Sequence, residues 1–579
     1  MLIFKILERF RRAAGWTTAA LSLAAGVYIG LAFFYLPPGA YWSPDIGYKR
    51  LQAENVRFTP WLDLAIEYPG AWIDPGLKYV PFRNTFYYLW QGRIHFAQPP
   101  AMAVLASPFV ALFGDRGERV TPLLAGLISL GLAAQLMRAV GAEPVWTGIV
   151  IAALATPVMI YSLFLWEHIL AVALGLGAVA LALQRPEARS RQAWILGGLL
   201  AGLAASARKE LMLFALVLGA ALALELYQNG NWRRWRAWTG LALWAAAALC
   251  MLGLYELFSY LNSGNLIPPE FRISVVPEYT PDAYLLVNGV GGLSDFVFDP
   301  QFGWRGDVML LTIIAYWAAS RWLRGRPREA IQIAALAALL VGEWYGVRRL
   351  GIASGLVGVL SASPFLAVGL GDAGAATRKL RRITFGFYGL VLLNLGLLTA
   401  SGPYQAGLEW GSRFALIVFP LSVPLVLNGL KAVRERAAQS WLARAHLALA
   451  LMLIGLSVFI QLLGVSKTST PAVGPESREA LLAVPEKQVL TNLWWLSAAA
   501  PRVYLAKEMF FINSEADLRA WMSAAYPSGV RAFVFVSYVP LTESIAVTLT
   551  PPGTQLKVVE TRRLSNMMLV THVALLPAP

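Results

Sequence analysis

The sequence predicts an α-helical polytopic membrane protein with about 13 transmembrane helices, interfacial helices on the outer side and a small C-terminal α/β domain. Of its 579 residues, 57% are hydrophobic and 14% are charged, which is far from the composition of soluble domains. The apolar residues are gathered in runs of roughly 15 to 23 residues, long enough to cross a bilayer as helices. Clusters of Lys and Arg separate the runs, as is typical of loops between membrane spans.

The first apolar run, from Ala14 to Leu36, is too long for the core of a signal peptide, and no convincing small-residue cleavage site follows it. We therefore expect a retained anchor. Further spans are predicted near residues 120–141, 145–165, 168–184, 193–207, 211–228, 237–258, 307–322, 329–346, 351–371, 383–401, 413–430 and 446–465.

Basic loops orient these spans with the N-terminus in the cytoplasm, because Lys and Arg favour that side of a membrane. The basic segments on the cytoplasmic side are 185–192, 231–236, 321–329, 378–382 and 431–436. The outer side then receives residues 37–119, 259–306, 347–351, 402–413 and the chain after about 466.

Residues 193–228 lie between two of these basic loops, so they are expected to cross the membrane and return as a short helical hairpin. Its turn carries Arg208, Lys209 and Glu210 on the outer side, against the positive-inside trend. The apolar stretch 98–114 begins with two prolines, contains Pro108 and precedes a charged segment. We expect an interfacial helix there rather than a span.

The apolar runs shorten after about Lys467, which predicts a domain boundary. Residues 1–465 form the predicted transmembrane module, with a first exterior loop at 37–119, and residues 466–579 form an extracytoplasmic α/β domain. Within that domain we expect strands near 488–492, 531–538 and 567–576, and a helix that Ser514 caps together with Asp517.

The net charge of +15 does not indicate nucleic-acid binding, because the basic residues are spread over short clusters instead of one stripe. A single cysteine, Cys250, excludes an intrachain disulfide and a thiolate metal cluster.

The first exterior loop is richer in charged residues and aromatics than a connector needs. It begins with "YWSPDIGYKR" (41–50), which places Asp45 close to Lys49 and Arg50, and continues with an aromatic segment and the helix at 98–114. Its other charged residues include Asp63, Asp74, Arg83, Arg93 and His95.

The order of these segments resembles the C-type (GT-C) membrane glycosyltransferase superfamily, which includes bacterial protein mannosyltransferase and aminoarabinose transferase-like enzymes. Three further segments are similar to it: the Gly-rich hairpin at 194–224, "VFDPQFGW" (297–304) and "GLEWGSRFALIVFP" (407–420). The resemblance implies an enzyme that uses a polyprenyl-phosphate-linked sugar. Many members carry an acidic pair in the first loop, whereas Asp45 is followed by Ile46.

This reaction requires a base for the acceptor hydroxyl and cations for the phosphate leaving group. Asp45 is the candidate base. Asp63, Asp74 and Glu167 are the acids to test next if Asp45 is not the base. The candidate phosphate-binding residues are Arg413 and Arg208, followed by Lys209, Lys49, Arg50, Arg348 and Arg349. Outward-facing cations also commonly contact lipid headgroups, and that interpretation stays open.

Glu167 and His168 in "LWEHI" (165–169) are weaker candidates for acceptor or metal binding. Cations can neutralise a monophosphate, so no cofactor is required and a divalent metal is optional. The predicted partners are membrane lipids, the donor and a glycan, lipid or protein acceptor, in a bacterial-type inner membrane. The alternatives are a lipid or polysaccharide transporter, disfavoured because no charge is expected in the middle of a span, and a non-catalytic scaffold.

Overall fold

The computed structural model describes residues 2–39, 41–58, 62–83, 86–184, 189–230, 233, 235–263, 284–350, 356, 358–371, 377–398, 410–539, 541, 554–565 and 568–577. The chain forms two compact units, which are described separately. The helical unit comprises Met1–Tyr35, Arg119–Ser259 and Phe271–Lys467, and the mixed unit comprises Leu36–Glu118, Tyr260–Glu270 and Thr468–Pro579.

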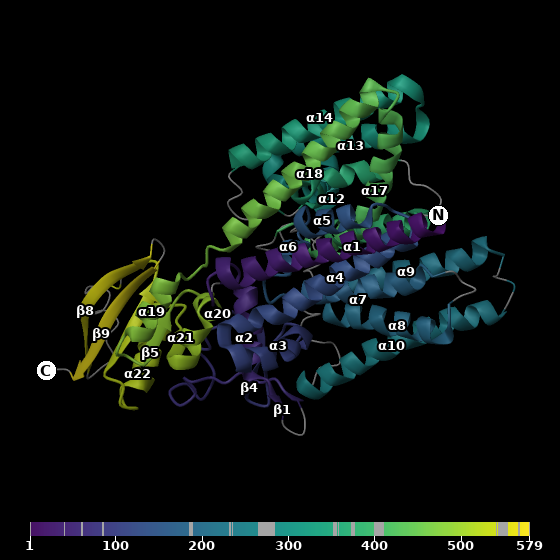
Figure 1. The fold of residues 1–579 in the computed structure, drawn as a ribbon. Coiled ribbons are helices and arrows are strands. Elements are labelled where there is room, and N and C mark those ends of the chain that lie inside the picture. The colour runs from purple at the N-terminus through teal and green to yellow at the C-terminus, as the bar shows by residue number, and fades with distance from the viewer. Residues whose placement is uncertain are drawn as a thin grey trace. The chain divides into compact units, whose positions relative to one another are not determined.

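Helices of very different length make up the first part of the helical unit (Figure 1). They are α1 (Leu2–Gly30), continued by a π-helical stretch (Leu31–Tyr35), α4 (Val120–Ala139), α5 (Val145–Leu154), α6 (Val158–Tyr161), α7 (Glu167–Ala182), α8 (Arg191–Ala207), α9 (Glu210–Gln228) and α10 (Trp235–Ser263).

The later helices are α12 (Tyr284–Val297), α13 (Trp304–Trp322), α14 (Gly325–Leu350), α15 (Val359–Ala362), α16 (Arg378–Leu398), α17 (Val418–Ala437) and α18 (Trp441–Thr468). The 3₁₀ turns described between them are η5 (Pro300–Phe302), η6 (Pro364–Leu370) and η9 (Arg413–Ala415).

Six helical stretches among the described residues are long and apolar enough to cross a membrane: Gly15–Tyr35, Ala101–Ala139, Glu210–Gln228, Trp238–Asn262, Gly325–Arg348 and Trp441–Thr468. The predicted fold class, a helical multi-pass membrane protein with a small C-terminal sheet domain, is therefore confirmed. The stretch 98–114 forms helix α3 (Ala101–Phe113) and a 3₁₀ turn, η2 (Gly114–Arg119), before α4. Its placement at the membrane surface stays a prediction.

The predicted spans at 145–165 and 351–371 are not single helices. Residues 145–165 divide into α5 and α6, because Pro157 removes a backbone donor and disfavours helix at the residue before it. In the described part of 351–371, α15 ends at Ala362, the backbone of Ser363 is non-helical (φ −148°), and Pro364 then begins η6. Local backbone chemistry interrupts apolar stretches that are long enough to span.

The predicted helical hairpin at 193–228 is formed by α8 and α9, with Arg208 and Lys209 in the turn. Gly198 and Gly202 lie one turn apart on α8, and a Cβ at either would collide with a backbone carbonyl of α10. Small residues at this spacing allow close helix packing, as membrane helices often require.

The mixed unit contains a five-stranded sheet in the order β6-β5-β7-β9-β8. Its strands are β5 (Gln488–Thr491), β6 (Glu508–Phe511), β7 (Ala532–Ser537), β8 (Thr554–Ser565) and β9 (Met568–Pro577). Strand β5 pairs in parallel with β6 and β7, whereas β9 is antiparallel to β7 and β8. The three strands expected from sequence are confirmed, while β6 and β8 were not anticipated.

The helices of the C-terminal part are α19 (Pro475–Ala483), α20 (Leu496–Ala499), α21 (Pro501–Ala506) and α22 (Glu515–Ala525). Ser514 is the N-cap of α22, and its side chain accepts a hydrogen bond from the Asp517 N–H, as predicted.

Residues 36–118 supply α2 (Pro44–Asn55), α3 and two small hairpins, β1 (Arg57–Phe58) with β2 (Leu62–Asp63) and β3 (Tyr87–Trp90) with β4 (Arg93–Phe96). Tyr48 and Phe82 of this segment share one hydrophobic core with Val489, Tyr504 and Phe510. The first exterior loop therefore shares a core with the C-terminal part of the chain, which joins the mixed unit from Thr468 onward. The predicted division into residues 1–465 and 466–579 stays a prediction.

Candidate functional site

Helix α2 begins inside the stretch "YWSPDIGYKR". Ser43 is its N-cap, and the Ser43 Oγ accepts a hydrogen bond from the Asp45 N–H at 3.4 Å. Pro44 occupies the first helical position, where its missing N–H has no consequence. Ser43, and not Asp45, is therefore the N-cap of α2.

Asp45 lies in the first turn of α2, where the helix dipole favours a negative charge. Its side chain is partly buried and accepts a hydrogen bond from the Gln98 amide at 3.5 Å. Gln52, further along α2, donates to the Gln98 carbonyl at 3.1 Å. The segment before α3 therefore runs along α2 and orients the Asp45 carboxylate.

Lys49 and Arg50 follow one turn later and are 1% and 5% exposed. The Lys49 ammonium donates to the Pro99 carbonyl. Arg50 pairs with Glu54, and it also lies 3.5 Å from Asp115 and 3.5 Å from Glu118. These carboxylates balance the charge of Arg50, which favours a role in holding α2 over a role in binding phosphate.

The other candidate acids of the first loop hold its backbone. Asp74 is 4% exposed and accepts hydrogen bonds from the Tyr68 hydroxyl and from the N–H groups of Lys78 and Tyr79. Asp63 accepts from the Ala65 N–H at 3.0 Å and from Arg93 at 2.8 Å. Partial burial opposes the charged form, but these bonds outweigh it and lower the pKa of Asp63.

His95, on β4, is buried and stacks on Tyr88 with ring centroids 5.4 Å apart. Burial, assisted by the nearby Arg93, lowers the pKa of His95 to about 4. The ring is therefore neutral at physiological pH.

The helical unit brings together candidates from three separate segments. Arg208 donates from Nε to Glu210 at 2.9 Å and from Nη1 to Glu167 at 3.0 Å. The guanidinium of Arg208 lies 5.7 Å from the centroid of the Phe414 ring, and that of Arg413 lies 5.5 Å from it. Arg208, Arg413 and His168 line one small cavity.

The two guanidinium groups beside Phe414 offer N–H donors to a phosphate, while Glu167 and Glu210 balance the charge of Arg208. A guanidinium has five N–H donors, so the two bonds to carboxylates leave Arg208 with further donors. Glu167 and Glu210 fix its orientation, which lowers the entropy cost of binding. The sequence indicated Arg208, Arg413 and Glu167 separately, but Phe414 as their common neighbour could not be predicted.

Three candidate cations remain: Lys209, Arg348 and Arg349. Lys209 is the N-cap residue of α9, and Arg348 is exposed near the end of α14. The side chain of Arg349 and residues 402–409 lie outside the described residues. In the described part of the chain, no group of three or more His, Cys, Asp and Glu side chains could hold a metal ion.

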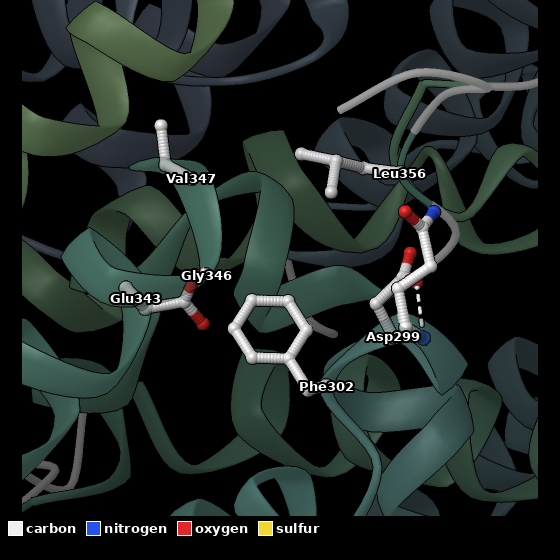
Figure 2. Close-up of a pocket in the computed structure, with 7 residues that line it drawn as sticks. Asp299, Phe302, Glu343, Gly346, Val347 and Leu356 are labelled. Atoms are coloured by element: carbon white, nitrogen blue, oxygen red, sulfur yellow. Dashed lines mark hydrogen bonds between the residues drawn. The ribbon is translucent and has the colours of Figure 1, made fainter. Parts of the chain in front are cut away.

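One expectation is wrong in the helical unit. We expected no charge buried within a span, yet Glu343 is completely buried in the stretch Gly325–Arg348 (Figure 2). A lone acid in the apolar run "ALLVGEWYG" (338–346) was the signal that could have indicated it.

No known protein family and no curated protein match the chain by sequence. Among solved structures, the chain is similar to ArnT from Cupriavidus metallidurans bound to undecaprenyl phosphate, with 15% identity, 96% of this chain and 98% of that chain covered, and a TM-score of 0.47. The apo oligosaccharyltransferase of Archaeoglobus fulgidus matches at 13% identity, with 90% and 69% covered and a TM-score of 0.47.

The Archaeoglobus fulgidus AglB oligosaccharyltransferase in complex with an inhibitory peptide and a dolichol-phosphate also matches, at 15% identity, with 90% and 69% of the chains covered and a TM-score of 0.44. All three TM-scores lie below 0.5.

Proposed function

We propose that the chain is a membrane glycosyltransferase that moves a sugar from a polyprenyl-phosphate donor to an acceptor outside the cytoplasm. The observation that carries the proposal is the placement of Arg208 and Arg413 around Phe414, with Glu167 and Glu210 orienting Arg208. These residues lie at the ends of α8, α9 and η9, and helices of the same unit are long and apolar enough for a bilayer. The phosphate of a lipid-linked donor lies at the surface of the bilayer, which is where the ends of membrane-spanning helices lie.

In the proposed reaction the Asp45 carboxylate takes the proton from an acceptor hydroxyl as the oxygen attacks the anomeric carbon. The bond between that carbon and the phosphate oxygen breaks, and the polyprenyl phosphate leaves with the electron pair. Arg208 and Arg413 stabilise the charge on the leaving phosphate. A single displacement inverts the configuration at the anomeric carbon.

The position of Asp45 supports its role as base. Asp45 is partly buried at the start of a helix, where the dipole favours a negative charge, and Gln98 and Ser43 fix its surroundings. Asp63 and Asp74 are the weaker choices, because their oxygens already accept bonds that hold the loop. Lys209, Lys49, Arg50, Arg348 and Arg349 stay secondary candidates for the phosphate.

The proposal includes an orientation, in which the N-terminus is cytoplasmic and the mixed unit is extracytoplasmic, in a bacterial-type inner membrane. The proposed partners are a polyprenyl-phosphate-linked sugar, a glycan, lipid or protein acceptor, and membrane lipids. A divalent metal is not required by this chemistry.

The test compares the Asp45→Asn variant with the wild type, both as full-length protein in nanodiscs. The donor is a polyprenyl-phosphate sugar, and the acceptor is a cell-envelope extract. Asparagine keeps the shape and removes the proton acceptor, so turnover should fall by about 10² or more while donor binding is retained. Asp517→Asn is the matched control, because Asp517 also lies in the first turn of a serine-capped helix. Normal release of polyprenyl phosphate by Asp45→Asn would defeat the assignment of the base.

A lipid or polysaccharide transporter is the second candidate, and the buried Glu343 favours it, because acids inside membrane helices often mark ion pathways. Proteoliposomes separate the two functions. A transporter moves its lipid or polysaccharide across the bilayer without consuming a sugar donor, whereas the proposed enzyme releases polyprenyl phosphate.

A further inference from the structure

The five-stranded sheet of the mixed unit has an edge that the proposed reaction does not use. Strand β5 runs parallel to both of its neighbours, β6 on one side and β7 on the other. The chain leaves β5 towards β6, whereas from β7 it continues to β8 on the opposite side of the sheet. In open α/β sheets, ligands bind where such connections diverge, beyond the carboxyl ends of the two strands.

Aromatic side chains follow both of these strands. Trp494 and Trp495 come soon after the end of β5 at Thr491, and Tyr538 directly follows the end of β7. The indole N–H of Trp495 donates to the Tyr538 hydroxyl at 2.9 Å. The two loops are therefore joined at the point where the connections diverge.

Thr491 holds the turn that carries the two tryptophans. It is 1% exposed, and its hydroxyl donates to the Val536 carbonyl on β7 at 2.9 Å. The same oxygen accepts a hydrogen bond from the Leu493 N–H at 3.0 Å. One side chain thus ties β5 to β7 and fixes the backbone that leads into Trp494 and Trp495.

The first exterior loop holds Trp494 from another direction. The rings of Phe86 and Trp494 stack, with centroids 6.0 Å apart and 13° between their planes. The guanidinium of Arg83 lies 5.5 Å from the centroid of the Trp494 ring. Arg83 and Asn492 are exposed, and Tyr538 is 51% exposed. Fixed aromatic rings and accessible polar groups therefore occur together at this edge.

This combination of side chains suits a sugar. The C–H groups along one face of a pyranose ring are apolar and slightly positive, so they stack on the negative face of an aromatic ring. The sugar hydroxyls can accept hydrogen bonds from Arg83 and exchange them with the Asn492 amide and the Tyr538 hydroxyl. A nucleotide fits less well, because the loop after β5 has the sequence NLWW (492–495), without the glycines of a phosphate-binding loop.

Trp and Tyr side chains also gather where proteins meet the surface of a membrane. Such anchoring requires the rings to reach the headgroups but does not require a fixed arrangement between them. Here Trp495 is fixed by its bond to Tyr538, and Trp494 is fixed by its stacking on Phe86. Rings that are held in place lower the entropy cost of binding a ligand, which favours a sugar over lipid headgroups.

We propose that this edge of the mixed unit binds a glycan, with Trp494 and Tyr538 contacting its sugar rings and with Arg83 and Asn492 bonding its hydroxyls. The site selects a glycan from the three proposed classes of acceptor. Its use as the acceptor site rests on the proposed function, whereas the binding of a sugar does not.

The test is saturation-transfer difference NMR of the full-length protein in nanodiscs, with chitohexaose, cellohexaose and mannohexaose as probes. The aromatic signals of the protein are irradiated, and empty nanodiscs provide the blank. We expect at least one of the three to bind with a millimolar or lower Kd. Saturation should be strongest at the C–H protons of one face of a sugar ring.

Three variants make the result specific. Trp494→Ala and Tyr538→Ala should each weaken binding at least about fivefold, because each removes a ring that stacks on the sugar. Trp72→Ala is the matched control, since Trp72 belongs to the same unit and is also 51% exposed. It should bind like the wild type. Thermal unfolding checks each variant, and if Trp494→Ala does not fold, Tyr538→Ala decides the question.

The proposal is overturned if none of the three probes binds, or if Trp494→Ala and Tyr538→Ala bind as tightly as the wild type. A bimane label tests the membrane alternative on Tyr538→Cys combined with Cys250→Ser, which removes the exposed native thiol. Quenching by brominated lipids would assign these aromatics to the membrane surface and also overturn the proposal. Binding is measured without a donor, so a failure of the proposed reaction would leave these results unchanged.

Discussion

Phe414 is approached by two guanidinium groups, but the two arginines are held differently. Arg208 is paired with Glu167 and Glu210, so its removal leaves two carboxylates without their partner and is expected to cost stability as well as binding. The guanidinium of Arg413 lies 5.5 Å from the centroid of the Phe414 ring. Substitution of each arginine in turn therefore separates binding of the phosphate from support of Glu167 and Glu210.

Arg413→Ala is expected to lower kcat/KM for the polyprenyl-phosphate donor about ten- to a hundredfold, because a charge-assisted bond to phosphate is lost. Lysine at this position should restore only part of the rate, since it lacks the planar fork. Arg305→Ala is the control, because Arg305 of α13 lies over Trp304 and Tyr345 instead. Unchanged donor kinetics would indicate that Arg413 contacts lipid headgroups.

Arg208→Ala should lower donor kcat/KM to a similar extent and also lower the melting temperature, because Glu167 and Glu210 lose their common partner. Arg208→Lys should recover much of the stability and less of the rate. Equal recovery of both would assign Arg208 a structural role only.

His95 predicts a dependence of stability on pH. The folded ring stays neutral down to pH about 4, whereas in the unfolded chain it takes up a proton below about pH 6.5. The unfolded state then binds more protons, so the free energy of unfolding should fall between pH 6.5 and 4, by up to about 1.4 kcal/mol per pH unit. Denaturant titrations of His95→Gln should show a flatter profile than the wild type; parallel profiles would contradict the prediction.

At the scale of elements, α2 is held by its contact with α20. A Cβ at Gly47 would lie 1.5 Å from the Ala498 carbonyl oxygen, a backbone atom that cannot move without shifting α20. Helix α2 carries Asp45, so the C-terminal part of the mixed unit supports the proposed base.

Gly47→Ala should destabilise the protein by about 1–3 kcal/mol, even though alanine is the better helix former by about 1 kcal/mol. The collision with the backbone outweighs the gain in helix propensity, so the free energy of unfolding should fall. Chemical unfolding of the purified protein measures this change. Gly76→Ala is the control, because a Cβ at Gly76 meets no atom within 4 Å. Equal stability of the two variants would show that α2 and α20 are not locked together.

The long elements were predictable because an apolar run of sufficient length reports a buried helix without any knowledge of its neighbours. The prediction of a single span at 351–371 was wrong, because Ser363 and Pro364 interrupt a run whose composition alone suits a span. In the site, residue types were predictable but partners were not. The contacts between Arg208 and Glu167, or between Arg50 and Asp115, join distant segments, which a single sequence does not specify.

At the scale of the whole molecule, the proposed orientation can be tested with reporters. If residues 98–114 lie at the surface of the membrane, a reporter fused after Gln228 should report the cytoplasm, and one fused after Gly474 should report the exterior. A span at 98–114 would invert every later loop and give the opposite pair, which would remove the proposed sites from the outer side.

The core shared by Tyr48, Phe82, Val489 and Phe510 also sets an order of events during synthesis. The first exterior loop leaves the ribosome early, but the strands that complete its core are made several hundred residues later. At about 5–20 residues per second this delay is on the order of a minute. Throughout it the loop exposes apolar side chains, so a newly made chain should be most sensitive to proteases and most dependent on chaperones before its last strand is released.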